Sequence, residues 1–228
     1  MCFHVKRGFR QRGGPPRDPW APYYLIVTVT AKPLDTPTGL HLISWSITRW
    51  MALHRDHLKN SGAAVHMSIA LPLKDSYHLG VISDTHGYLP LRALGVFQGV
   101  DVILHAGDIG SQEILRTLAQ VAPVLAVRGN MDGGPWANLL AEKESIRVGD
   151  ALIHLIHDLL RLRPDAAGNG CLAVVNGHTH RPSVETRHGV LYVNPGSAGA
   201  PRHGEHPCVA VIRVVGTAAQ AELIPLPD

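Results

Sequence analysis

Cysteine is scarce in this sequence, which has only Cys2, Cys171 and Cys208 among its 228 residues. Their number is odd, and no two of them have the CxxC spacing of a redox or zinc motif. A disulfide framework and a cysteine zinc site are therefore disfavoured. We expect a protein of the reducing cytoplasm.

Long apolar runs are also missing. The most suggestive one, Tyr23–Val29, is seven residues long, whereas a membrane-spanning helix needs about 20 apolar residues. A basic stretch precedes it, as in a signal peptide, but the preceding segment is long and contains several prolines, and no convincing cleavage site follows. We expect no membrane partner.

The larger part of the chain has no excess of positive charge. Residues 1–66 hold nine Lys or Arg and three Asp, a net charge of +6, whereas the remainder holds twelve Lys or Arg against fifteen Asp or Glu, a net charge of −3. A protein that reads nucleic acid needs a concentrated basic face. We therefore do not expect a nucleic-acid partner, and any such role would rest on residues 1–66 alone.

Residues 1–66 also differ from the rest in pattern. They are rich in Pro, Gly and Arg at first, and a weak helical face at Leu42, Trp45, Trp50 and Leu53 follows. We interpret them as a poorly ordered N-terminal extension, with a membrane-surface or partner-binding arm as the alternative. Because the pattern becomes regular after Met67, a start codon assigned too far upstream is a further hypothesis. Residues 67–228 then form the folded domain.

From Tyr77 onward, short apolar runs alternate with helical patterns. The pattern predicts strands at 79–83, 102–105 and 124–127, with helices at 89–97 and 111–120. This order is typical of a parallel sheet covered by helices. After Pro135 the pattern predicts strands at 145–148, 151–156, 172–175, 183–186, 190–193, 208–215 and 220–225. These favour a second, largely antiparallel sheet that packs face to face against the first, with helices outside.

Four segments place metal-ligand side chains directly after an apolar strand. They are Asp84-Thr85-His86, Gly107-Asp108, Gly129-Asn130 and Gly177-His178-Thr179-His180. Open α/β sheets bind ligands beyond the carboxyl ends of their strands, so all four segments are expected to open into one crevice. Mixed carboxylate, amide and imidazole ligands suit divalent manganese, iron, zinc or nickel.

The number of these side chains exceeds what one ion needs. The four segments supply six, and a further histidine comes from the strand Ile153–His157. Seven ligands with a bridging carboxylate suit two ions about 3.5–4 Å apart, which can clamp the attacking and leaving oxygens of a phosphoryl group. The spacing therefore predicts a two-metal site for phosphate-ester hydrolysis.

In the order D-x-H, G-D, G-N and G-H-x-H, the chain resembles the calcineurin-like metallophosphoesterases. GNxD at 129–132, GHTHRP at 177–182 and NPGS at 194–197 look like the small bacterial and archaeal phosphodiesterases. That branch also contains the small subunit of the retromer coat. The resemblance covers about residues 77–225 and implies an α/β fold, a four-layer α/β/β/α sandwich of two mixed sheets flanked by helices.

The resemblance also implies roles for the ligand residues. The first ion would be held by Asp84, His86 and His180, Asp108 would bridge, and the second ion would be held by Asn130, His157 and His178. We expect two divalent ions, Mn²⁺ foremost, with Ni²⁺, Fe²⁺ or Zn²⁺ as alternatives.

Two positions depart from the family pattern. The second-metal histidine is normally followed by Gly, but Asp158 follows His157 here, so that His154 remains a rival ligand. Related phosphatases often carry a histidine after the G-N pair that protonates the leaving group, and Met131 stands there instead. General-acid help of this kind contributes about 10²–10⁴-fold. The absence of this histidine indicates substrates whose leaving groups depart easily, or a proton delivered to the leaving group by water.

Other residues have two interpretations each. His105 is expected to pack or to support a ligand rather than to bind metal. The turn Asn194–Ser197 is structural or cradles a phosphate. Arg202 and His203 bind the substrate or are solvated. Asp132 orients Asn130 or a water, or is a simple turn residue.

The expected function is hydrolysis of small phosphate esters, diesters foremost and also monoesters. A water shared by two cations would lose its proton, and the hydroxide would attack phosphorus in line while Asn130, Asp108 and His178 assist catalysis. A catalytically silent scaffold of the same fold, acting in protein assembly, is the alternative. A homo-oligomer is also an open alternative.

Overall fold

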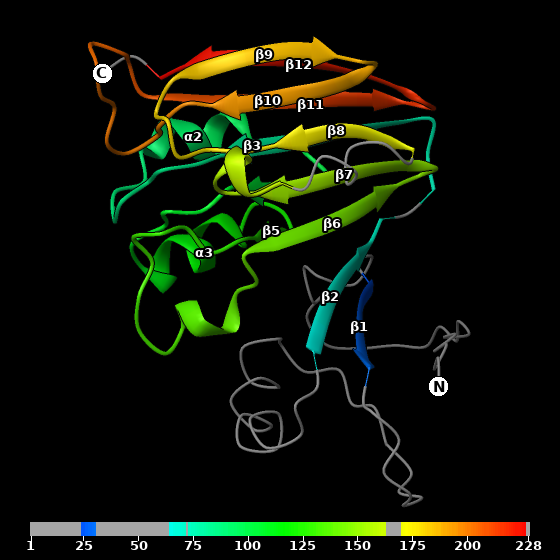
Figure 1. The fold of residues 1–228 in the computed structure, drawn as a ribbon, viewed down its shortest axis with the longest axis horizontal. Coiled ribbons are helices and arrows are strands. Elements are labelled where there is room, and N and C mark those ends of the chain that lie inside the picture. Colours follow the sequence, from blue (N-terminus) through cyan, green and yellow to red (C-terminus); the bar gives the residue numbers. More distant parts are fainter. Residues whose placement is uncertain (1–23, 31–63, 72, 163–169, 227–228) are drawn as a thin grey trace, which may run out of the picture. The chain divides into compact units, whose positions relative to one another are not determined.

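The computed structural model describes residues 24–30, 64–71, 73–162 and 170–226 (Figure 1). Chain contacts divide the protein into two units, residues 1–70 and 71–228. In the first unit, β1 (Tyr24–Thr30) and β2 (Ala64–Ala70) form an antiparallel pair. The domain boundary expected after residue 66 falls inside β2, and the weak helical face at residues 42–53 lies outside the described residues. The separate extension therefore stays a prediction.

The first sheet of the second unit has the strand order β12-β11-β3-β4-β5. Its strands are β3 (Ser76–Ile82), β4 (Val102–His105), β5 (Val124–Ala126), β11 (Cys208–Val215) and β12 (Ala218–Pro225). Strands β3, β4 and β5 are parallel, because α2 (Leu91–Val96) and α3 (Gln112–Leu118) return the chain between them. This confirms the predicted order of alternating strands and helices. Helix α2 is shorter than predicted, since Pro90 is extended and only caps it.

The second sheet has the strand order β6-β7-β8-β10-β9. Its strands are β6 (Lys143–Val148), β7 (Ala151–Ile156), β8 (Cys171–Val175), β9 (Pro182–Arg187) and β10 (Val190–Pro195). The expectation of a largely antiparallel sheet was wrong, since β7, β8 and β10 run parallel. Parallel neighbours must begin at the same end of the sheet, so a long connection has to carry the chain back. The connection from β7 to β8 is long enough to do this.

The last two strands, β11 and β12, do not lie in the sheet that the sequence pattern favoured for them. β11 pairs with β3, with Ala210 opposite Val81, and β12 pairs with β11. Both strands therefore belong to the first sheet, which is mixed like the second. Alternating apolar residues predict a strand but do not say which neighbour it pairs with, so the sequence pattern could not place β11.

The two sheets pack face to face, with β8, β9 and β10 against β11 and β12 (Figure 1). On the outer face of the first sheet, α2 and α3 bury Phe97, Ile114 and Leu118 against Ile82 and Ile103. Gly80 makes this packing feasible, since a Cβ there would lie 2.6 Å from Cδ1 of Phe97. On the outer face of the second sheet, the 3-10 turn η2 (Leu159–Arg161) supplies the helical layer in the described residues. The predicted sandwich of two mixed sheets is confirmed.

The described residues include two of the three cysteines, and their helices can be compared with the length of a membrane span. Cys171 and Cys208 are both buried and unpaired. No helix in the described ranges is long and apolar enough to span a bilayer.

Candidate metal centre

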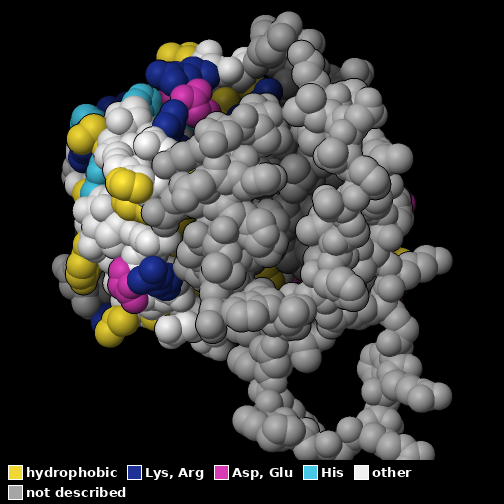
Figure 2. Space-filling view, turned by 90° about the horizontal axis from the view of Figure 1, so that it is seen from below, with side chains coloured by type: hydrophobic (Ala, Val, Ile, Leu, Met, Phe, Trp, Pro, Cys, Tyr) yellow, Lys and Arg dark blue, Asp and Glu magenta, His cyan; other side chains and the backbone are white. Residues whose placement is uncertain are grey.

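The candidate ligands lie at the carboxyl ends of strands. Asp84 and His86 follow β3, Asp108 follows β4, and Asn130 lies beyond β5. From the second sheet, His157 follows β7 and the segment 178–180 follows β8. Strands β3, β4 and β5 are parallel to one another, and so are β7 and β8. Within each sheet, the carboxyl ends of these strands therefore lie at the same edge. In Figure 2, histidine side chains gather at the left edge of the described surface, with Lys and Arg beside them.

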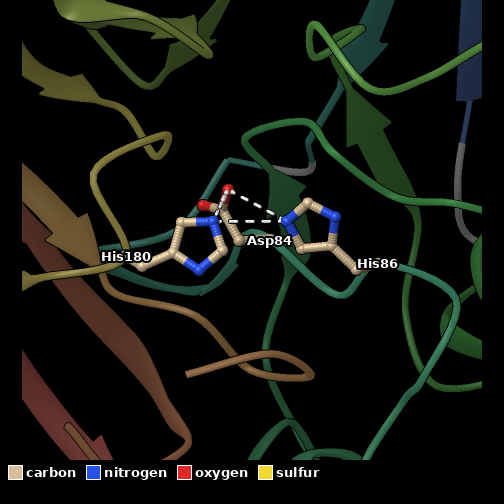
Figure 3. A group of neighbouring side chains, drawn as sticks. All are labelled: Asp84, His86 and His180. Carbon is tan, nitrogen blue, oxygen red and sulfur yellow. Dashed lines mark hydrogen bonds and ion pairs between the residues drawn. The ribbon is translucent and has the colours of Figure 1, made fainter. Parts of the chain in front are cut away.

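Asp84, His86 and His180 point toward a common position (Figure 3). The Nε2 atoms of His86 and His180 are 3.3 Å apart, and their rings are stacked with centroids 5.0 Å apart. Oδ1 of Asp84 is 3.3 Å from Nε2 of His180 and 3.8 Å from Nε2 of His86. Three ligand atoms therefore surround one point.

The two oxygens of Asp84 have different environments. Oδ2 accepts hydrogen bonds from Oγ of Ser83 at 2.6 Å and from the backbone N–H of His178 at 3.0 Å. Oδ1 is fully buried and has no hydrogen-bond partner. Leaving a buried carboxylate oxygen unsatisfied is costly, so this atom is suited to a cation.

Two histidines are oriented by backbone carbonyl groups. Nδ1–H of His180 donates to the carbonyl of Ala200 at 2.8 Å, and Nδ1–H of His157 donates to that of Ala106 at 2.7 Å. The remaining nitrogen of each ring, Nε2, then faces the cluster. This is the arrangement in which neutral histidines hold metal ions.

A second group of ligand atoms lies beside the first. Oδ1 of Asp108 accepts the backbone N–H of Met131 at 2.8 Å, while Oδ2 is 3.4 Å from Nε2 of His157 and 3.8 Å from Nε2 of His86. Oδ1 of Asn130 is 3.0 Å from Nε2 of His157 and 3.0 Å from Nδ1 of His178. The structure thus brings all seven predicted ligand residues together.

Two groups of side chains that could each hold a cation share a carboxylate. Asp84 belongs to both groups of ligand atoms, one with His86 and His180 and the other with Asp108 and His157. Asp108 also reaches the histidines of both groups. The expected bridging role of Asp108 stays a prediction, and membership of both groups makes Asp84 a second candidate for it.

The charges of these groups influence one another. Burial raises the pKa of Asp84 more than the hydrogen bond from Ser83 lowers it. Burial also acts to raise the pKa of Asp108, but the hydrogen bonds from His157 and Met131 outweigh it, and the pKa is lowered. Burial acts to lower the pKa of His157, and its bond to Asp108 reverses this, so that the pKa is raised. The negative charge of Asp108 therefore stabilises a positive charge beside His157.

The backbone is strained where the ligands lie. Positive φ angles occur at seven described residues other than glycine, and five of them are candidate ligands: Asp84, His86, Asp108, His178 and His180. Such angles are uncommon outside glycine and are retained mainly at functional sites, where surrounding contacts enforce them.

Asp132 fastens two of the loops to each other. Its Oδ1 accepts the backbone N–H groups of Ile109 at 2.7 Å and Gly110 at 2.9 Å, and its Oδ2 accepts that of Gly129 at 2.8 Å. It is therefore more than a simple turn residue, because it joins the loop after β4 to the loop that carries Asn130.

His105 supports the ligands without facing the cluster. It is fully buried, its Nδ1 accepts the backbone N–H of Gly107 at 3.2 Å, and its Nε2–H donates to Oγ1 of Thr85 at 3.0 Å. Oγ1 of Thr85 in turn donates to the carbonyl of Ile109 at 2.9 Å. Burial lowers the pKa of His105 to about 3, so the ring is neutral.

The segment Asn194–Ser197 is a structural turn. The N–H of Gly196 donates to Oδ1 of Asn194 at 2.9 Å, and the N–H of Ala198 donates to the carbonyl of Ser83 at 3.0 Å. Oγ of Ser197 donates to the carbonyl of Asp84 at 2.7 Å. Because these donors already have protein partners, the alternative of a phosphate cradle receives no support.

The rival ligand His154 lies elsewhere. Its Nδ1 is 2.7 Å from Oγ of Ser145 on the neighbouring strand, whereas His157 lies in the cluster. Arg202 and His203 are exposed. Burial lowers the pKa of His180, and the charge of Arg202 adds to this. Substrate binding by Arg202 and His203 stays a prediction.

Comparison with known proteins agrees with this geometry. A "Probable metallophosphoesterase" of Methanocaldococcus jannaschii is 37% identical over 164 residues, which cover 66% of this chain and 82% of the relative. Phosphodiesterase YfcE of Escherichia coli is 28% identical over 152 residues, covering 54% and 79%. The structure of vacuolar protein sorting 29 from Cryptosporidium parvum superimposes with a TM-score of 0.54 at 19% identity, covering 68% and 100%. Residues 77–217 match the family described as the calcineurin-like phosphoesterase superfamily domain, to which this chain belongs.

Proposed function

We propose that the protein is a metal-dependent phosphoesterase that hydrolyses phosphodiesters, and also phosphomonoesters, with two divalent cations. The observation that carries this proposal is Oδ1 of Asp84, which is buried without a hydrogen-bond donor and faces Nε2 of His86 and His180. Carboxylate, amide and imidazole donors fit manganese and similar ions. Family membership and the names of the relatives support hydrolysis of phosphate esters.

The chain's own residues have distinct roles in this proposal. Cations bound there supply Lewis acidity, activate water and neutralise charge on the phosphoryl oxygens. Asp84 and Asp108 supply the negative charge that retains them. Asn130 is exposed, and its Oδ1 faces His157 and His178, so its amide NH₂ is free to donate to a phosphoryl oxygen. His178 holds Asn130 in this orientation.

Met131 limits the leaving group. Its side chain is 66% exposed beside Asn130, and a thioether cannot donate a proton. The proposed enzyme therefore favours esters whose alcohol departs readily as an anion, such as aryl esters.

The test is manganese-dependent hydrolysis of bis(p-nitrophenyl) phosphate by the full chain. Asp108→Asn and His178→Ala are expected to lose activity while keeping the circular dichroism spectrum. The matched control is His188→Ala, because His188 is also exposed and also has a positive φ but lies on the turn between β9 and β10. Full activity in Asp108→Asn would overturn the proposal.

The alternative is a scaffold that has the fold without the reaction. The likeness to vacuolar protein sorting 29 bears on the fold alone. The complete ligand set argues against a silent scaffold, because a buried carboxylate oxygen without a donor is costly in a protein that binds no cation. A titration in which manganese does not bind would favour the scaffold. The native metal, oligomeric state and cytoplasmic location stay predictions.

A further inference from the structure

A cavity of about 300 Å³ lies on the outer face of the second sheet, at the same end as the candidate metal centre. We name it the η2 cavity, because η2 forms one wall. Its lining consists of Asp158, Leu159, Leu160, Asn176, Gly177, His178, Thr179, Ser183, Glu185, Arg187, Tyr192 and Asn194. Its size is close to the lower end of the range of about 300–1,000 Å³ for small-molecule sites.

The η2 cavity and the candidate metal centre share one residue, His178. This residue lines the cavity, and its Nδ1 is 3.0 Å from Oδ1 of Asn130. A molecule with its phosphorus atom at the centre can therefore extend past His178 into the cavity.

The unusual Asp158 explains why the cavity has an apolar wall. Its Oδ1 accepts the backbone N–H of Leu160 at 3.0 Å and so caps η2 directly after the ligand His157. The turn presents Leu159 and Leu160 to the cavity, and the side chain of Leu160 is 93% exposed. The residue that departs from the family pattern therefore shapes the neighbouring cavity.

The charges in the η2 cavity disfavour a second phosphate. Among the lining residues that the structure describes, Arg187 is the only Lys or Arg. Its Nη2 and Nε donate to Oε2 of Glu185 at 2.6 and 2.9 Å, and its guanidinium lies 5.1 Å from the ring centre of Tyr192. Asp158 is paired in turn with Arg161, whose Nε lies 3.7 Å from its Oδ2. Because these charges are paired with each other, the cavity suits an uncharged group that contacts Tyr192 and the leucines.

We propose that the η2 cavity binds the uncharged apolar or aromatic ester group that stays on phosphorus during hydrolysis of a phosphodiester. This inference rests on the proposed function. In-line displacement expels the leaving group on the side opposite the attacking water, whereas the other ester group stays on phosphorus beside His178, which lines the cavity. The cavity thus selects diesters with one bulky uncharged ester group.

The test compares two substrates with the same leaving group, bis(p-nitrophenyl) phosphate and methyl p-nitrophenyl phosphate. The ratio of their kcat/KM values reports the contribution of the retained group. Leu160→Asn is expected to lower this ratio about tenfold, the low end of what an apolar contact discriminates. Leu73→Asn is the matched control, because Leu73 is 91% exposed and lies outside the cavity lining.

Each outcome has one meaning. A ratio that falls in Leu160→Asn and not in Leu73→Asn supports the inference. Continued hydrolysis with the wild-type ratio in Leu160→Asn overturns the inference and leaves the proposed function standing. If the manganese-loaded wild type hydrolyses neither diester, both proposals fail.

Discussion

The backbone N–H of His178 donates to Oδ2 of Asp84 at 3.0 Å, across 94 residues of sequence. Asp84 follows a strand of the first sheet, and His178 follows a strand of the second. This bond therefore joins the two sheets at the candidate centre. It also occupies Oδ2, so that Oδ1 is the oxygen left to face His86 and His180.

We predict that Asp84→Asn weakens manganese binding by at least about 100-fold, since loss of a supporting group alone costs about 10–100-fold. The amide keeps the shape of the carboxylate but removes its charge. Isothermal titration calorimetry measures the change. Asp150→Asn, at an exposed turn, is the control and is expected to bind as the wild type does. Equal affinity in Asp84→Asn would show that this carboxylate does not hold the ion.

Gly129 is predicted to tolerate no side chain. A Cβ there would overlap the backbone nitrogen and carboxylate of Asp108, so Gly129→Ala must displace that ligand. We expect a loss of about 1–3 kcal/mol in the free energy of unfolding, as for other overpacked sites, together with loss of phosphoesterase activity.

Gly133→Ala is the matched control, because a Cβ at Gly133 meets no atom within 4 Å. Urea denaturation and hydrolysis of bis(p-nitrophenyl) phosphate measure both effects. Wild-type behaviour of Gly129→Ala would mean that the two loops are not packed as described.

Asp132 gives a third prediction. Its carboxylate accepts three backbone N–H groups, from Ile109, Gly110 and Gly129. Asp132→Asn places an NH₂ group against at least one of these donors, which is expected to cost about 1–3 kcal/mol in unfolding free energy. Because the loops then separate, kcat is expected to fall. Unchanged urea midpoint and kcat would contradict the clamp, and Asp150→Asn serves again for comparison.

The clustering of the candidate ligands could be predicted from the sequence because their signal is local. Asp84, Asp108 and His178 each come directly after or close behind an apolar strand, and parallel strands end at one edge. The same reasoning located α2 and α3, with errors of a few residues at their ends.

The remaining features depend on residues far apart in the sequence. The pairing of Ala210 with Val81 puts β11 in the first sheet, and the bonds of Asp132 to Ile109 and Gly110 span more than twenty residues. Neither leaves a trace in periodicity. The η2 cavity was missed for the same reason, since Leu160 and Tyr192 meet only when β7 and β10 lie on either side of β8.

His105 predicts how stability depends on pH in the metal-free protein. Burial lowers its folded-state pKa from 6.5 to about 3. Between these values the unfolded chain binds a proton at this site that the folded chain does not. The free energy of unfolding therefore falls as the pH drops below 6.5, by up to about 1 kcal/mol per pH unit from this group. Well above pH 6.5, where neither state binds a proton at this site, the group contributes no pH dependence.

Urea denaturation between pH 7 and pH 4.5 tests this with His105→Gln, which cannot titrate. Other groups contribute to the slope, so the prediction concerns the difference between variant and wild type. The variant is expected to be less stable at pH 7, because the bonds to Gly107 and Thr85 are weakened, yet to lose less stability on acidification. His188→Gln, at an exposed turn, should keep the wild-type slope. Equal slopes in His105→Gln and the wild type would mean that His105 takes up its proton without unfolding, against its complete burial.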